Sequence, residues 1–231
     1  MARGFGATLG VGTTDRIDTA GVSLGSTYTW ACSVNRNGNG GAGFGSVFQH
    51  GSVGPGNAIF TNGGLGTYEL AVRFSVTSGI WRWTRPATGS FARIMAIVDA
   101  TSTGNTPAVY MNGVLQTLTL ATAPVGVAAP LVSTIIRIGN NAALTVNWDG
   151  LLAEFAAWPR RLTADDAKAY GIGRYSPLLI PGGFPLAYVP MLRENRDYFG
   201  TDPTITGTQV QPHDRVIYPA GAMAMGNDGA A

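Results

Sequence analysis

The sequence FARIMAIVDATSTGNTPAVYMNGVLQTL (91–118) contains two apolar runs joined by the dipeptide Asn112-Gly113. Both residues tolerate a positive φ, and Asn-Gly between two apolar runs is the strongest short-range signal for a β-hairpin. The run over 91–98 is a further strand candidate, separated from the hairpin by a polar loop that begins at Asp99. This stretch therefore predicts three consecutive short strands and favours an all-β fold.

The same pattern extends in both directions from the hairpin. Over 68–76 apolar residues occupy every second position, which is the period of a half-buried strand. Similar short runs follow one another from residue 28 to residue 158, and Gly- and Asn-rich segments separate them. Many short strands divided by such turns are typical of a sandwich or a barrel.

The chain after the last strand candidate has a different character. Thr163 is a suitable N-cap and two aspartates follow it, so a short helix is predicted over 164–170. Beyond residue 175 prolines are frequent and alternation is sparse. We therefore predict one domain over 1–175 and an irregular C-terminal extension over 176–231, which packs on the body or on neighbouring subunits.

The composition is low in charge and rich in glycine. Of 231 residues, 12% are charged and 33 are glycine, whereas soluble domains average roughly 25% charged residues. Fourteen arginines accompany a single lysine, Lys168, which reflects either the base composition of the genome or a surface used for protein contact. Basic residues do not cluster and no apolar run approaches a membrane span, so neither a nucleic-acid nor a membrane partner is expected.

Three segments stand in a characteristic order: the stretch 91–118, then RIGNN (137–141), then WDGLLAEFAAWPRRLTADDAKAY (148–170). Together with TYTWACSV (27–34), they resemble the laminin-G-like and concanavalin-A-like lectin/glucanase superfamily. The resemblance covers about two-thirds of the chain. It implies a jelly-roll sandwich of two antiparallel sheets with one short helix.

The extension carries a second, less specific resemblance. Tyr-Ser-Pro (175–177), Pro-Leu-Ala-Tyr (185–188) and Pro-His-Asp-Arg (212–215) resemble the trailing segment of such domains in bacteriophage virion proteins. This implies a non-enzymatic capsid decoration or tail-associated protein, located in the virion after assembly in the host cytoplasm. Its expected partners are the major capsid or tail protein and further copies of itself. The candidate assembly contacts are Arg193, Arg196, Arg215, Met223 and Met225.

Catalytic chemistry has little support in the sequence. Superfamily members that hydrolyse glycans resemble one another in a Glu-x-Asp-x-x-Glu strand, and this chain has no such motif. Asp149 and Glu154 are five residues apart and would lie on opposite faces of a regular strand. We expect Glu154 to be a structural acid paired with Arg160 or Arg161. A glycoside hydrolase is therefore the third hypothesis.

The same strand makes a further prediction about faces. Regular alternation places Glu154 on one face together with Leu152, Ala156 and Trp158. No metal or other cofactor is expected, because the two histidines of the chain lack the spacing of metal ligands; calcium held by loop carbonyls stays open as an alternative.

A carbohydrate-binding module or adhesin, binding a host-surface glycan, is the second hypothesis. Trp81 and Trp83 share one face of a strand and could stack on sugar rings, although large aromatic side chains are more often part of a core. Arg82 and Arg85 beside them could line a surface. The glycine-rich loops 37–45 and 62–66 either build a ligand site or only join strands.

Overall fold

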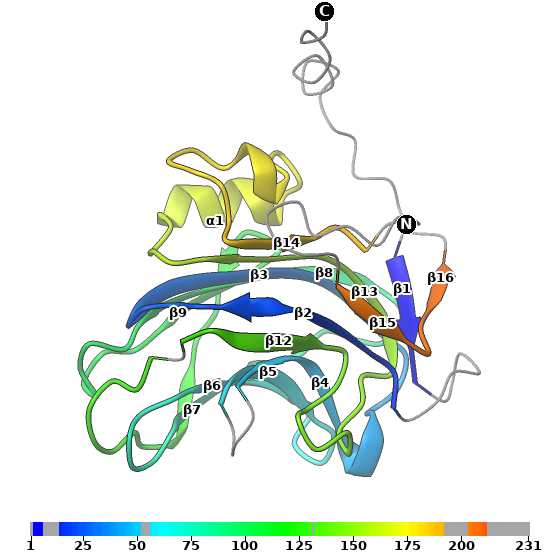
Figure 1. Ribbon diagram of the computed structural model, residues 1–231, viewed down its shortest axis with the longest axis horizontal. Coiled ribbons are helices and arrows are strands. Elements are labelled where there is room, and N and C mark those ends of the chain that lie inside the picture. Colours follow the sequence, from blue (N-terminus) through cyan, green and yellow to red (C-terminus); the bar gives the residue numbers. More distant parts are fainter. Residues whose placement is uncertain (1, 7–13, 52–55, 131, 192–202, 212–231) are drawn as a thin grey trace, which may run out of the picture.

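A computed structural model describes residues 2–6, 14–51, 56–130, 132–191 and 203–211 (Figure 1). Within these ranges the chain forms two stacked antiparallel sheets, which confirms the predicted all-β jelly-roll sandwich. The strands are β1 (Ala2–Phe5), β2 (Arg16–Val22), β3 (Thr27–Arg36), β4 (Phe44–His50), β5 (Asn57–Asn62), β6 (Thr67–Val72), β7 (Gly79–Thr84), β8 (Phe91–Asp99), β9 (Ala108–Met111), β10 (Val114–Leu115), β11 (Thr119–Thr122), β12 (Thr134–Ile138), β13 (Gly150–Trp158), β14 (Ala187–Val189), β15 (Thr204–Thr206) and β16 (Gln209–Gln211). The helical elements are α1 (Ala164–Gly171) and the single 3-10 turns η2 (Gly41–Gly43) and η3 (Pro177–Leu179).

The first sheet has the strand order β10-β9-β8-β3-β13-β1-β16, and β14 pairs with β13 beside this path. The second sheet has the order β11-β7-β6-β5-β4-β12-β2-β15. The predicted hairpin is the β9–β10 connection, where Asn112 and Gly113 have φ values of 51° and 78°. Positive φ at both central residues is the geometry that an Asn-Gly hairpin turn requires, so this prediction is confirmed.

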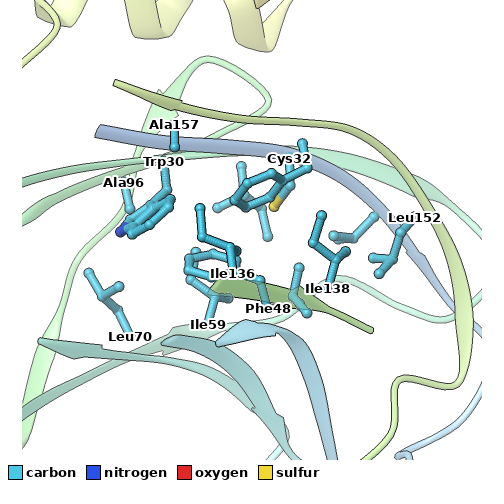
Figure 2. Close-up of a cluster of buried hydrophobic side chains, with 14 of the residues drawn as sticks. Trp30, Cys32, Phe48, Ile59, Leu70, Ala96, Ile136, Ile138, Leu152 and Ala157 are labelled. Carbon is cyan, nitrogen blue, oxygen red and sulfur yellow. The ribbon is translucent and has the colours of Figure 1, made fainter. Parts of the chain in front are cut away.

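The main core fills the space between the two sheets. Trp30 on β3 packs against Phe48 on β4, with ring centroids 4.6 Å apart, and Phe155 on β13 completes this aromatic centre. Figure 2 shows aliphatic side chains of both sheets around it, among them Ile59 and Ile136. The inward positions of the alternating strands therefore supply one continuous apolar layer.

A second, smaller core lies on the outer face of the first sheet. There α1 covers the sheet (Figure 1), and Tyr170 on the helix is buried together with Trp158 of β13 and Tyr188 of β14. The helix begins at the predicted N-cap: Thr163 Oγ1 accepts a hydrogen bond from Asp166 N, and Thr163 N donates to Asp166 Oδ2. This reciprocal capping box explains why so short a helix starts where it does.

The region predicted to be an irregular extension contributes three short strands within the described residues. β14 pairs with β13, β15 pairs with β2, and β16 pairs with β1. β15 and β16 are the outermost strands at one side of the two sheets. Each is only three residues long, which is too short for alternation to reveal it in the sequence.

Candidate functional site

The five residues proposed from the sequence as assembly contacts all lie outside the described residues. They are Arg193, Arg196, Arg215, Met223 and Met225. Their role therefore stays a prediction.

Trp81 and Trp83 are core residues. They project inward from β7 and are only 3% and 2% exposed. The ring of Trp83 lies against Tyr68, its direct neighbour on β6, with centroids 5.6 Å apart. The hypothesis that sugar rings stack on these two tryptophans is therefore wrong, because both rings are buried in the core between the sheets. The alternative interpretation, that they are core residues, is confirmed.

Glu154 occupies a β-bulge in β13. Its φ is 52°, in the left-handed region, and the pairing of β13 with β3 shifts register around it. The extra residue reverses the alternation: Leu152 and Phe155 face the main core, whereas Ala156 and Trp158 face the outer core. The predicted common face is therefore wrong, since regular alternation does not continue through a bulge.

Glu154 is buried, with 3% of its surface exposed. Burial raises the pKa of Tyr170 on α1, and the negative charge of Glu154 raises it further. The expected arginine partners make their contacts elsewhere in the described structure: Arg160 donates to Pro181 O, and Arg161 pairs with Asp99 at 3.0 Å. The pairing of Glu154 with either arginine is therefore wrong.

The glycine-rich loops do meet at one end of the sandwich. Gly63 N donates to Gly43 O at 2.8 Å, and Gly41 N donates to Asn147 O at 3.1 Å. Asn37 N donates to Asp149 O at 2.9 Å, which ties the loop after β3 to the start of β13. We call the loops 37–43, 63–66, 85–89 and 147–149 together the glycine-loop end.

Two arginines lie at the glycine-loop end. Arg36 ends β3 in the first sheet, and Arg85 follows β7 in the second. Burial lowers the pKa of Arg36, and the like charge of Arg85 lowers it further, while Asp149 acts in the opposite direction. Burial raises the pKa of Tyr68, and the positive charges of both arginines act in the opposite direction. The sequence singled out Arg85 but not Arg36, whose only signal was its place between a strand and a glycine-rich loop.

A second surface lies at the side of the sandwich opposite β15 and β16. Residues 107–136 contain no Asp, Glu, Lys, Arg or His, and they include β10 and β11, the outermost strands of their sheets. Large apolar side chains are exposed along it. They are Val114 and Leu115 on β10, Leu120 on β11, and Val125 and Val127 after β11. We call these five residues the uncharged edge.

Sheet edges are ordinarily protected from pairing with other chains by charges, prolines or bulges. β10 and β11 carry neither a charge nor a proline, although the pairing of β11 with β7 shifts register once. Exposed apolar side chains that gather at one edge favour contact with another protein. The uncharged edge therefore has the composition of a docking surface.

Among the described residues no three His, Cys, Asp or Glu side chains gather closely enough to hold a metal ion. In the same ranges no helix combines the length and the apolar character needed to cross a bilayer.

No profile of a known protein family and no curated protein matches this chain. Solved structures share its fold. A heptameric SAP-like pentraxin from Limulus polyphemus superposes with a TM-score of 0.61 at 12% identity, covering 90% of this chain and 93% of the pentraxin. A putative carbohydrate binding protein from Bacteroides ovatus gives a TM-score of 0.61 at 14% identity over 93% of this chain. The chain spans 60% of that second protein. These likenesses show a lectin-like jelly-roll fold.

Proposed function

We propose that the protein is a non-enzymatic structural protein of a virion, a capsid decoration or tail-associated protein that assembles through the uncharged edge. The observation that carries this function is the exposure of Leu115 and Leu120, 58% and 51%, on outermost strands without charge. Such a surface favours contact with another protein, since burying it there removes apolar area from water. The major capsid or tail protein and further copies of this chain are the partners that fit.

The absence of enzymatic activity is part of the same proposal. Glu154, one of the two carboxylates considered for catalysis, is buried, with only 3% of its surface exposed to a substrate. Asp149 lies at the start of β13, beside the main chain of Gly38. These two carboxylates therefore belong to different environments, which supports a structural role for Glu154.

Substitutions that introduce negative charge at the uncharged edge test the assembly role. Particles are purified from cells that make the other virion proteins together with wild type, the Leu115→Glu/Leu120→Glu variant or the Phe184→Glu control. Phe184 is exposed as well, at 68%, but lies outside the uncharged edge. The double variant is expected to be lost from particles while the control is retained. Equal incorporation of all three, or absence of the wild type from particles, would refute this function.

Glycan binding is a second candidate function, favoured by the gathering of the glycine-rich loops around Arg36 and Arg85. Loops at the end of a rigid sandwich are common positions for binding residues. A glycan array probed with wild type and with Arg85→Gln tests it. Array binding that disappears in the variant would place sugar recognition at the glycine-loop end.

A further inference from the structure

The glycine-loop end contains hydrogen-bond donors that the described residues do not satisfy. Arg36 Nε, Arg85 Nη1, Trp83 Nε1 and Trp148 Nε1 are buried atoms without a hydrogen-bond partner in these ranges. The ring of Tyr68 connects the two tryptophans, with centroids 5.6 Å from Trp83 and 6.5 Å from Trp148. Both indole side chains are more than nine-tenths buried. A buried donor without a partner is unfavourable, so a group of such donors calls for an acceptor.

Four other arginines in the described ranges pair with a carboxylate. Arg16 and Arg137 pair with Asp18, Arg82 pairs with Glu69, and Arg161 pairs with Asp99. In the described part of the chain, neither Arg36 nor Arg85 has a carboxylate within ion-pair distance. Arg36 donates through Nη1 to Gly38 O and Asn39 Oδ1, which are neutral acceptors.

The charge balance at this end is positive. Arg36 and Arg85 carry two positive charges, and Asp149 is the acidic group that acts on Arg36 there. A guanidinium presents a planar fork of N–H donors that matches an oxyanion, and such charge-assisted hydrogen bonds are roughly twice as strong as neutral ones. We propose that the glycine-loop end binds an oxyanion, free or as the acidic group of a sugar, between Arg36 and Arg85.

The main chain beside both arginines leaves this end accessible. Gly89 N donates to Arg36 O at 3.0 Å, and Arg85 N donates to Gly66 O at 3.5 Å. A Cβ added to Gly66 or to Gly89 would meet no atom within 4 Å. Arg36 and Arg85 are themselves half-buried, so part of each residue is open to solvent.

The experiment is a titration of the full chain at constant ionic strength, followed by calorimetry and by tryptophan fluorescence. The probes are acetate, inorganic phosphate, glucuronate and glucose, and the proteins are wild type, Arg36→Gln, Arg85→Gln and Arg174→Gln. Arg174 is an exposed arginine outside the glycine-loop end, so its variant removes the same charge elsewhere. We expect saturable binding of at least one anion, with a dissociation constant of about 1 mM or below. Each of the first two variants should weaken this binding about tenfold, and the Arg174 variant should not.

The probes separate this inference from the glycan-binding candidate that it extends. Binding of acetate or phosphate supports an oxyanion site even if no sugar binds, whereas binding of glucuronate alone supports an acidic sugar as the ligand. The inference is overturned if no anion binds. It is also overturned if glucose binds as well as glucuronate, or if all three arginine variants lose affinity equally, since the last result reflects net charge alone. Circular dichroism of each variant confirms that the fold is kept.

Discussion

At the scale of single residues, Glu154 combines a buried carboxylate with a left-handed backbone. For any residue other than glycine this conformation is unfavourable by about 1 kcal/mol or more, because Cβ approaches the following carbonyl oxygen. The bulge that contains it shifts the alternation of β13 by one position, so Leu152 before it and Phe155 and Ala157 after it face the main core, while Ala156 and Trp158 face the outer core. One extra residue thus changes which positions of the strand face each apolar layer.

The left-handed backbone at residue 154 reverses the usual order of stability of alanine and glycine variants in a strand. At most strand positions alanine is more stable than glycine, but at residue 154 we expect Glu154→Gly to be more stable than Glu154→Ala by about 1 kcal/mol. Both variants lose the carboxylate, so the difference between them reports the backbone alone. Urea unfolding of the two variants measures it. A higher unfolding midpoint for the alanine variant would show that residue 154 is not held in the left-handed region.

His50 gives a prediction about pH. It is fully buried, Nε2 lies 3.1 Å from Val22 O, and burial lowers its pKa from the ordinary value of 6.5. As the pH falls through about 6.5, the unfolded chain binds a proton that the folded protein does not, so the free energy of unfolding decreases. Urea midpoints between pH 7.5 and pH 5.5, about one unit either side of this pKa, should fall for wild type and fall less for His50→Gln.

His213 provides the matched control, because it is the other histidine of the chain. His213→Gln should keep the dependence of wild type. If His50→Gln loses stability with acid as steeply as wild type does, His50 is not the group responsible.

At the scale of elements, α1 and the β9–β10 hairpin are in close contact at two glycines, Gly171 and Gly113. A Cβ added to Gly171, at the end of the helix, would lie 1.9 Å from Gly113 N. The hairpin turn therefore rests against the last turn of the helix with no room for a side chain. This contact couples the outer layer to the strands at the uncharged edge.

Gly171→Ala is therefore expected to destabilise the protein by about 2 kcal/mol, although alanine is the better helix former. Gly25→Ala is the control, since a Cβ there would meet nothing within 4 Å. Thermal unfolding of both variants measures the difference. A Gly171→Ala protein as stable as wild type would contradict the close packing of the helix on the hairpin.

Elements with a strong local signal were predictable from the sequence, and elements fixed by distant partners were not. The hairpin at Asn112-Gly113 and the helix after Thr163 follow from local backbone preferences. The bulge at Glu154 has no local signal, because glutamate does not favour a positive φ. Of the candidate site, the glycine-rich loops were identified, but their convergence on Arg36 depends on strand pairing between segments far apart in the chain.

At the scale of the whole molecule, each lateral side of the sandwich ends in two strands that follow one another in the sequence. One strand of each pair belongs to the first sheet and the other belongs to the second. These pairs are β10 and β11 at one side and β15 and β16 at the other. The second pair covers β1 and β2, whose main chains would otherwise be free at the edge. The two sides therefore differ: one is completed by the C-terminal region and the other carries the uncharged edge.

Removing β15 and β16 should expose the edges of β1 and β2. A chain ending at Met191 is expected to unfold at a temperature lower by about 5 °C or more and to self-associate, because unpaired edges template strand addition. A chain ending at Gln211 keeps both strands and is the control. Calorimetry and analytical ultracentrifugation measure the two properties. An unchanged, monomeric protein ending at Met191 would show that these strands do not stabilise the sheets.

The position of β1 also has a consequence for biosynthesis. This strand precedes the other described strands in the sequence, yet it lies between β13 and β16, whose residues begin at 150 and 209. During translation it therefore has neither partner until β13 has been made. Pairing across so long a loop is slow, so the nascent polypeptide carries β1 unpaired while the strands between β1 and β13 emerge, and this part of the first sheet forms after them.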